Sequence, residues 1–313
     1  MTNLSEFTFL SSDGKTQLHG MLWEPEGVAV RAVLQICHGV AEHIARYDGF
    51  ARALNEQGIV VAGHDHLGHG KSLPEGGTPV YFGEGNTWNT VVDDIYVLHQ
   101  RLKQRYPDVP LCIMGHSMGS FLTRTYLIRY PGTVKAAVIM GTGWQPQAAI
   151  TGGLALANAI AAVSGENATS ELVTELAFGS YNKLFAPNRT KVDWLSADES
   201  NVDDYIADPL CGADATVGLF RQMLHGIRFN QRQSHLRQMD REMPVLFVAG
   251  DKDPVGSCSK GVRQTYDAFR AAGMRDCTLK LYPGLRHEIL NEKAYAADIT
   301  KNIEAWLLSK LEK

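Results

Sequence analysis

The sequence predicts an α/β protein with a mostly parallel, doubly wound sheet that a helical segment interrupts. Short apolar runs typical of buried strands alternate with longer segments of helical spacing in the first 143 residues. The alternation then stops, and residues 144–236 show helical patches but no run typical of a buried strand. It resumes at residue 244 and continues to the end of the chain. One sheet with an inserted helical segment explains this order best.

Eight segments are expected to form the strands. The first two are separated by Ser12-Asp-Gly-Lys, a turn signal, so we expect them to pair as an antiparallel hairpin. Several of the others are apolar along their whole length, as strands buried on both faces of a sheet are. The predicted strands are residues 6–11, 17–24, 32–37, 59–62, 111–114, 134–140, 244–250 and 278–282.

Helices are expected between these strands. Residues 46–57 place Phe50, Ala53 and Leu54 at helical spacing, and Gly58 stops the helix. The other predicted helices of the sheet domain are residues 88–105, 118–130, 257–272 and 294–311. We therefore assign residues 1–143 and 237–313 to the α/β core and residues 144–236 to a helical cap over the carboxyl edge of the sheet.

The cap begins with an uncharged stretch. Residues 136–165 contain no charged side chain. Gln145, Pro146 and Asn158, with the adjacent Gly152 and Gly153, make residues 144–165 too polar and too interrupted for a membrane-spanning helix. Two interpretations stay open: a buried cap helix, or a surface that touches lipid or admits substrate.

Composition narrows the class of protein. A length of 313 residues with 44% hydrophobic and 20% charged residues is that of a globular protein. A net charge of −4 gives no basic footprint, so nucleic acid is not an expected partner. The five cysteines form no C-x-x-C pair, and the N-terminal residues lack the features of a signal peptide. We therefore expect a cytoplasmic protein with reduced thiols.

Ser117 is the candidate nucleophile. It lies in Gly115-His-Ser-Met-Gly119, which has the G-x-S-x-G form, between a predicted strand and a predicted helix. A serine on such a tight strand-to-helix turn is forced outward at the edge of the sheet. Glycines flank it because larger residues would clash where the turned backbone meets its neighbours. The motif predicts nucleophilic catalysis by a serine hydroxyl.

Such a serine needs a base within hydrogen-bonding reach and an acid that orients the base. On this type of turn the order along the chain is serine, acid and histidine, with each partner on a loop after a later strand. His287 follows the last predicted strand and is the expected base. Asp253 follows the strand before it and is the expected acid. It is favoured over Asp251, which leaves the strand directly and is better placed to close the turn through its own side chain.

Two backbone N–H groups are expected to stabilise the oxyanion that forms during acyl transfer. One is that of Met118, the residue after the nucleophile. The other should come from the loop after strand 32–37, which reads His38-Gly-Val-Ala-Glu-His43. We expect the N–H of Val40 there, with Gly39 allowing the backbone to approach closely.

The other histidines are set aside by their position. His116 adjoins the nucleophile and is expected to point away from it, and His225 and His235 fall in or near the cap. The run His64-Asp-His-Leu-Gly-His69 offers three imidazoles and a carboxylate, as a metal site would. A Ser–His–Asp set needs no metal, however, so we expect no metal or cofactor. The side chains of this run are expected to hydrogen-bond and brace the sheet edge.

Together these motifs resemble the serine-aminopeptidase-like branch of the α/β-hydrolase superfamily, and within it monoacylglycerol lipases and bacterial lysophospholipases. The resemblance runs through most of the chain and is weakest in residues 144–180. The motifs that carry it are His38-Gly-Val-Ala-Glu-His43, Arg46-Tyr47, Gly63-His-Asp-His-Leu-Gly-His-Gly-Lys-Ser72, Gly115-His-Ser-Met-Gly119, Asp208-Pro-Leu-Cys211, Gly250-Asp-Lys-Asp253 and Tyr282-Pro-Gly-Leu-Arg-His287.

The resemblance implies an α/β-hydrolase fold with an eight-stranded sheet and the same site residues: Ser117, Asp253 and His287 as triad, Val40 and Met118 as oxyanion donors. It implies hydrolysis of a lipid-like carboxylic ester, a monoacylglycerol or lysophospholipid, without a cofactor. It also implies a cap lined for an acyl chain, with weak, transient contact with a membrane surface. Cysteines near the family's site suggest that thiol reagents modulate the protein through Cys211 or Cys258.

Other functions compete with this one. A carboxylesterase or thioesterase for small or aromatic esters would use the same residues with a narrower, more polar cap pocket. A non-catalytic binding protein on a hydrolase fold usually lacks part of the triad, which this chain retains. Proline-specific aminopeptidase activity is disfavoured because the cap shows no acidic pair clearly placed to hold a substrate amine. Serine at position 117 excludes epoxide and haloalkane hydrolases with an aspartate nucleophile.

Overall fold

The computed structural model describes residues 1–311, without the side chains of residues 171, 176 and 177. All eight predicted strands are present. They are β1 (Thr2–Leu10), β2 (Gln17–Pro25), β3 (Ala32–Cys37), β4 (Ile59–His64), β5 (Leu111–His116), β6 (Ala137–Met140), β7 (Val245–Gly250) and β8 (Cys277–Tyr282).

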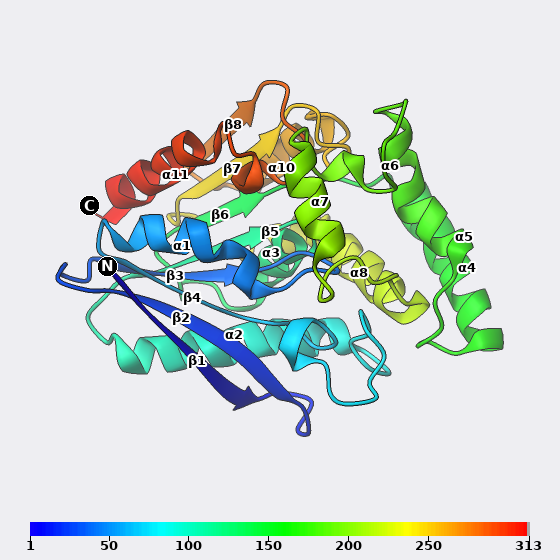
Figure 1. The fold of residues 1–313 in the computed structure, drawn as a ribbon, viewed down its shortest axis with the longest axis horizontal. Coiled ribbons are helices and arrows are strands. Elements are labelled where there is room, and N and C mark those ends of the chain that lie inside the picture. The colour runs from blue at the N-terminus through cyan, green and yellow to red at the C-terminus, as the bar shows by residue number, and fades with distance from the viewer. Residues whose placement is uncertain (312–313) are drawn as a thin grey trace.

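The strands form one sheet of eight strands in the order β1-β2-β4-β3-β5-β6-β7-β8 (Figure 1). β1 and β2 form the expected antiparallel hairpin, in which Leu10 pairs with Gln17, and β2 also runs antiparallel to β4. All the other neighbours are parallel. The carboxyl ends of β3 to β8 therefore share one edge of the sheet, where ligands bind in folds of this kind.

Helices cover both faces of the sheet. The core contains η1 (Ile44–Tyr47), α1 (Asp48–Asn55), η2 (Gly70–Ser72), α2 (Thr87–Arg105), α3 (Met118–Arg129), α10 (Lys260–Ala271), η5 (Ile289–Asn291) and α11 (Ala296–Leu311). α1 and α11 pack on one face, and α2, α3 and α10 pack on the other. Alternate residues of the central strands point to opposite faces of the sheet. In β3, Val33 packs on the side of α2, α3 and α10, and Leu34 packs on the side of α1 and α11.

Some element boundaries differ from those expected. The predicted helix 46–57 is divided into η1 and α1, and β6 starts at Ala137 rather than at residue 134. The predicted helix 257–272 begins only at Lys260, because Ser257, Cys258 and Ser259 have φ angles of 50°, 49° and 79°. These positive φ angles are incompatible with a right-handed helix.

Helices fill the segment that was expected to form the cap. They are α4 (Gln147–Ser164), α5 (Glu171–Thr174), η3 (Glu175–Gly179), α6 (Ser180–Lys183), η4 (Asp193–Leu195), α7 (Glu199–Ala207), α8 (Val217–Asn230) and α9 (Gln233–Leu236). α8 contacts α4 and also α2 and α3 of the core. α4 and α5 form the outer edge of the molecule at the right of Figure 1.

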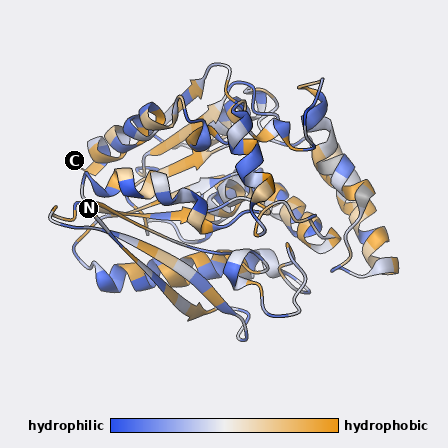
Figure 2. Ribbon diagram, viewed as in Figure 1, coloured by the Kyte–Doolittle hydropathy of each residue, from blue (hydrophilic) through white to orange (hydrophobic). Residues whose placement is uncertain are grey.

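α4 is neither interrupted, as the sequence suggested, nor buried, as the first of the two open interpretations held. The helix is unbroken from Gln147 to Ser164, and by length and composition alone it could cross a membrane. It is not a buried cap helix, because only Ile150, Leu154 and Ala157 are buried. Leu156, Ile160 and Ala161 are half-buried, and the remaining apolar residues, mostly alanines, lie on the outside of the fold (Figure 2).

Candidate active site

Ser117 lies on the turn between β5 and α3. Its φ of 54° and ψ of −123° place a non-glycine residue outside the favoured regions of the backbone. The Ser117 N–H donates to the carbonyl of Met140 at 3.0 Å, which ties the turn to the neighbouring strand β6. The side chain is 8% exposed. The strained turn is therefore held by the sheet and presents the serine at the carboxyl edge.

The two glycines of the motif permit this turn. A Cβ atom on Gly119 would lie 2.0 Å from the carbonyl oxygen of Cys37, and one on Gly115 would lie 2.3 Å from that of Gly119. Neither approach is possible for a larger residue, as expected from the sequence. The close contact between the turn and the end of β3 also brings the turn next to the loop that follows β3.

His287 and Asp253 meet at the same edge of the sheet. His287 follows β8, Asp253 follows β7, and their Nδ1 and Oδ1 atoms are 3.0 Å apart. Both side chains are buried, with relative exposures of 2% and 0%. Asp253 Oδ1 also accepts a hydrogen bond from the Val255 N–H at 2.9 Å. The carboxylate is thus fixed in position and leaves Nε2 as the ring nitrogen of His287 that is available for proton transfer.

Small residues bring the parts of the site together. A Cβ on Gly39 would lie 3.1 Å from Cβ of Ser117, so the loop after β3 passes directly over the serine. A Cβ on Gly141 would lie 3.1 Å from Cε1 of His287. Because Ser117 bonds to the carbonyl of Met140, which precedes Gly141, the serine and His287 approach the same point at the end of β6.

The two expected oxyanion donors belong to the residue after Ser117 and to the loop that passes over it. Met118 is the first residue of α3, so the helix offers no partner for its N–H. Val40 follows Gly39 in the loop over the serine, and its N–H makes no hydrogen bond within residues 1–311. Both N–H groups are therefore left without a backbone partner next to Ser117.

Asp251 occupies the other candidate position for the acid. Its Oδ1 accepts a hydrogen bond from the N–H of Gly284 at 2.8 Å. The side chain therefore closes the loop after β8 onto the loop after β7, rather than closing its own turn as expected. It supports the loop that carries His287.

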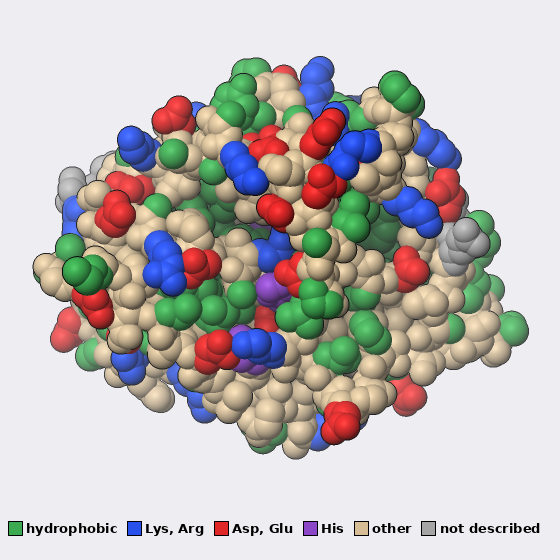
Figure 3. All heavy atoms as spheres, viewed as in Figure 1, with side chains coloured by type: hydrophobic (Ala, Val, Ile, Leu, Met, Phe, Trp, Pro, Cys, Tyr) green, Lys and Arg blue, Asp and Glu red, His purple; other side chains and the backbone are tan. Residues whose placement is uncertain are grey.

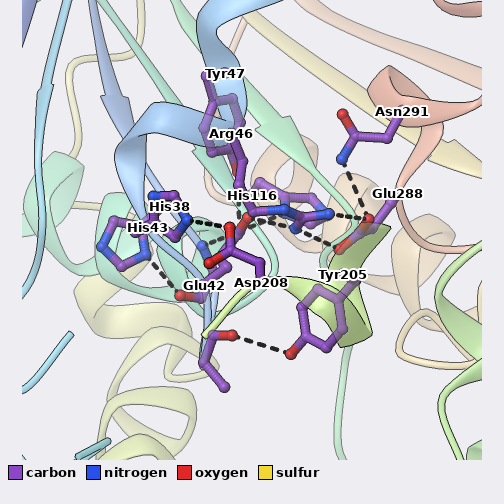
Figure 4. A network of polar contacts seen from close by, with 12 residues as sticks. His38, Glu42, His43, Arg46, Tyr47, His116, Tyr205, Asp208, Glu288 and Asn291 are labelled. Atoms are coloured by element: carbon purple, nitrogen blue, oxygen red, sulfur yellow. Dashed lines mark hydrogen bonds and ion pairs between the residues drawn. The ribbon is translucent and has the colours of Figure 1, made fainter. Parts of the chain in front are cut away.

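A buried charged network that the sequence motifs did not predict lies beside the site (Figure 4). Glu42 Oε2 is 2.9 Å from Arg46 Nη1, and Arg46 is bound bidentately by Glu288 at 2.7 Å. Glu42 Oε1 accepts from the Gly39 N–H at 2.5 Å and from the Tyr47 hydroxyl at 3.0 Å. The network joins the loop over Ser117 to the residue after His287.

Neighbouring charges and hydrogen bonds keep the two carboxyl groups of this network ionised. Burial alone would raise the pKa of Glu42, but the hydrogen bond from His116 and the charge of Arg46 hold it well below its usual value. Burial likewise opposes ionisation of Glu288, whose pKa is nevertheless lowered by the charge and hydrogen bonds of Arg46. Buried charges of this kind persist because each has a partner.

A cavity of about 670 Å³ reaches the network from the surface between α1 and α11. Its lining includes Glu42, His116 and Glu288 as well as Phe50 and Ala297. The face of the molecule in Figure 3 is hollowed near its centre, where a histidine and cationic side chains are visible. The cavity lies next to the triad, because its lining includes His116, which precedes Ser117, and Glu288, which follows His287.

The cap contributes to the site through Trp194 and Leu195. The ring centroid of Trp194 is 5.1 Å from that of His287. The Leu195 carbonyl accepts hydrogen bonds from the N–H groups of His287 and Glu288, at 3.0 and 2.7 Å. These contacts attach the cap to the loop that carries the base.

In the histidine-rich run, Asp65 and His69 form hydrogen bonds as expected, with Nδ1 of His69 2.9 Å from the carbonyl oxygen of Leu67. The carboxylate of Asp65 accepts from the Ile44 and Lys71 N–H groups, at 2.8 and 2.9 Å. The expectation was wrong for His64 and His66, whose ring nitrogens have no hydrogen-bond partner among the described residues. Burial lowers the pKa of His64 to about 3, so the ring is neutral and packs as an aromatic side chain.

One group of residues could offer ligands to a metal ion. His43, Asp208 and Cys211 place their donor atoms within 4.8 Å of one another. His43 Nε2 is already 2.8 Å from Asp208 Oδ2. Burial raises the pKa of the Cys211 thiol, and the nearby charge of Arg46 opposes a divalent cation. The contact between His43 and Asp208 by itself ties the segment after α7 to the loop after β3.

A comparison with known families identifies the chain. Residues 28–294 match the family described as serine aminopeptidase, S33. The chain belongs to this serine hydrolase family. The match spans the core and the inserted helices alike, and it confirms the resemblance drawn from the motifs.

Several relatives of this S33 hydrolase are known. It is 30% identical to the monoacylglycerol lipase of Mycolicibacterium smegmatis, over 98% of both chains. It is 28% identical to the monoglyceride lipase of Mus musculus, over 96% of this chain and 90% of the other. The solved structure of a thermostable carboxyl esterase from Bacillus coagulans, in complex with glycerol, superposes with a TM-score of 0.92 at 26% identity, covering 99% of this chain and all of the other. These likenesses confirm the α/β-hydrolase fold.

Proposed function

We propose that this S33 hydrolase cleaves the carboxylic ester of a lipid-like substrate, such as a monoacylglycerol, through an acyl-enzyme on Ser117. The observation that carries the proposal is the buried His287–Asp253 pair beside the strained turn of Ser117. Relatives over nearly the whole chain that are named monoacylglycerol or monoglyceride lipase support the substrate class.

The proposed reaction gives each group of the site a role. Ser117 attacks the ester carbonyl as His287 takes the hydroxyl proton, and the N–H groups of Val40 and Met118 stabilise the oxyanion. Asp253, which accepts the Nδ1–H of His287, stabilises the imidazolium that forms. His287 then returns the proton to the leaving alcohol, and water releases the fatty acid by the same steps.

The cap offers an apolar surface beside the base. The ring of Trp194 lies next to His287, and the rings of Tyr181 and Phe178 lie 5.3 and 6.3 Å from that of Trp194. These three aromatic side chains come from η3, α6 and η4. An acyl chain attached to the reacting carbonyl would pack against them, whereas a strongly polar substituent would lose its hydration there.

A panel of three esters tests the substrate. Fatty acid release from a long-chain monoacylglycerol, a lysophosphatidylcholine and a short aryl ester would be measured with wild-type protein, and with Ser117→Ala as the blank. We expect the monoacylglycerol to give the highest kcat/KM. A preference for lysophosphatidylcholine would change the head group, and the absence of turnover of either lipid would contradict the proposal.

A carboxylesterase for small or aromatic esters is the second candidate. The likeness to the carboxyl esterase of Bacillus coagulans favours it, because that solved structure superposes on almost the whole chain. The two candidates share the triad and differ only in what the cap accepts. Turnover of the aryl ester alone in the same panel would establish this second function.

We further propose that the cap touches a membrane surface when the substrate is bound. α4 carries no charged residue, and Val163 near its end is 88% exposed. Leu172 in α5 and Leu184 after α6 are 54% and 60% exposed. Apolar side chains gathered at one edge of a water-exposed domain favour contact with a lipid interface.

Replacing Val163 and Leu172 by aspartate should weaken the binding of the protein to phosphatidylcholine vesicles. The loss of two apolar contacts and the gain of two charges is expected to lower partitioning about tenfold or more. Vesicle sedimentation would measure it. Val28→Asp is the control, because Val28 lies outside the cap on the α/β core domain and is 42% exposed. It should leave partitioning unchanged. Equal binding of all variants would contradict contact through the cap.

The proposed site of action is the cytoplasm. All five cysteines are free thiols, and two of them, Cys37 and Cys112, are buried in the core. This pattern is typical of proteins from reducing compartments. Cys258 is exposed and Cys211 is half-buried, so a thiol reagent would reach Cys258 first.

A further inference from the structure

His116, which the sequence placed away from the nucleophile, lies between the base and the charged network. Its ring centroid is 4.7 Å from that of His287. Nδ1 of His116 is 3.2 Å from Oε1 of Glu42, and Nε2 is 3.3 Å from the carbonyl oxygen of His287. The ring is buried, and Figure 4 shows it beside Glu42 and Arg46.

The partners of His116 determine its protonation. A backbone carbonyl can only accept a hydrogen bond, so Nε2 must carry a proton. Glu42 accepts hydrogen bonds from Gly39, Tyr47 and Arg46, and a carboxylate in that role holds no proton of its own. Nδ1 must then carry a proton as well. A neutral imidazole has only one N–H, so both contacts are satisfied only by an imidazolium.

The charges of the network agree with this count. Glu42 and Glu288 are negative and Arg46 is positive, which leaves one negative charge unbalanced. Side-chain exposures of 4%, 3% and 10% show that little of these three groups is open to solvent, although the cavity between α1 and α11 reaches them. A second cation at His116 makes the four buried groups neutral as a set. An unbalanced buried charge would be far more unfavourable.

The four groups also connect the loop over Ser117, the segment before Ser117, the loop that carries His287 and the cap. Glu42 binds the Gly39 N–H in the loop over Ser117, and His116 directly precedes Ser117. His116 binds the main chain of His287, and Glu288 follows it. Asn201 of α7 donates to Glu288 at 2.9 Å, so the network also reaches the cap. A shift of any one group would move the base relative to the nucleophile and the oxyanion donors.

We propose that His116 is an imidazolium and a positioning residue, whose two N–H groups hold Glu42 and the main chain of His287 while its charge disfavours a second proton on His287. The kinetic part rests on the proposed function, because it concerns the same triad. The protonation of His116 itself does not depend on the proposed function.

Several charged groups act on His287, with opposite effects. Asp253 favours its protonated form through a direct hydrogen bond, and Glu288 and Glu42 act in the same direction from further away. His116, beside the ring, and Arg46, behind Glu42, oppose it. Replacing His116 by a neutral side chain therefore removes one of the positive charges that lie near His287 and repel a second proton there.

The protonation state can be observed directly by NMR on protein labelled with ¹⁵N at the histidine rings. We expect one ring, absent from the spectrum of His116→Gln, with protons on both nitrogens at pH 7. In Glu42→Gln the same ring should lose a proton at this pH, because its carboxylate partner is gone. A neutral His116 ring in the wild type would overturn the proposal, whether or not the protein hydrolyses the tested esters.

The kinetic consequence is read from the pH profile of kcat/KM, whose acid limb reports the pKa of the base in the free enzyme. In His116→Gln we expect the midpoint of this limb to rise by about one pH unit. His99→Gln, at a buried histidine in α2, is the matched control and should leave the midpoint unchanged. A midpoint that stays in place in His116→Gln would overturn the electrostatic role. If His116→Gln does not fold, the NMR spectrum of the histidine rings in Glu42→Gln still tests whether His116 is an imidazolium.

Discussion

Replacing Ser117 by alanine is expected to lower kcat on the preferred ester by about 10⁴-fold or more, with the fold intact. The reason is that no acyl-enzyme can form without the hydroxyl, so only the oxyanion donors and substrate binding would still promote the reaction. Alanine keeps the Cβ that already occupies the strained turn, so the free energy of unfolding should change little. Steady-state hydrolysis and thermal unfolding of the two proteins would measure both effects.

The control for this variant is Ser120→Ala in the same helix. The hydroxyl of Ser120 donates to the Ser117 carbonyl at 2.6 Å and has no chemical step to perform in the proposed reaction. We expect its loss to lower kcat less than tenfold. A covalent phosphonate probe should label wild type and Ser120→Ala but not Ser117→Ala. Equal turnover by wild type and Ser117→Ala would rule out Ser117 as the nucleophile.

Replacing Asp253 by asparagine should have the second largest effect, a fall in kcat of about 10³- to 10⁴-fold. The carboxylate accepts the Nδ1–H of His287 at 3.0 Å and leaves Nε2 as the proton acceptor. An amide in this buried position can present its NH₂ to Nδ1, which would select the wrong tautomer of the ring. It also carries no charge to stabilise the imidazolium.

Asp251→Asn is the matched control for this change. Asp251 lies two residues away on the same loop, and its Oδ1 accepts only from the Gly284 N–H within the described chain. An asparagine oxygen can accept the same bond, so we expect kcat within about threefold of wild type. If Asp251→Asn were the inactive variant and Asp253→Asn the active one, the assignment of the acid would be reversed.

Local patterns in the sequence predicted most of the core. Each central strand is an apolar run because both of its faces are buried, and Gly58 marks the end of the first helix. The strained turn of Ser117 could also be expected, because its flanking glycines have no alternative that fits within 2.0 to 2.3 Å of the neighbouring carbonyls. Asp253 and His287 followed from chain order, since parallel strands place the loops after them at one edge.

The cap was harder to predict. The sequence of an uncharged helix does not show whether the helix is buried or exposed, because composition tells only which side chains are apolar. Only the packing of α4, with Ile150, Leu154 and Ala157 turned inward, showed that most of the helix faces outward. The function of its outer surface depends on this orientation.

The sequence by itself determined the order of strands and helices, the turn at Ser117 and the choice of Asp253 and His287 as its partners. Each of these depends on contacts between residues close in sequence, or on strand ends that a parallel sheet must bring together. Only the tertiary structure assembled His116, Glu42, Arg46 and Glu288 into one buried network. These residues come from three segments far apart in the sequence: the chain after β3, the end of β5 and the loop after β8. A buried charge is stable only where partners from elsewhere in the chain surround it.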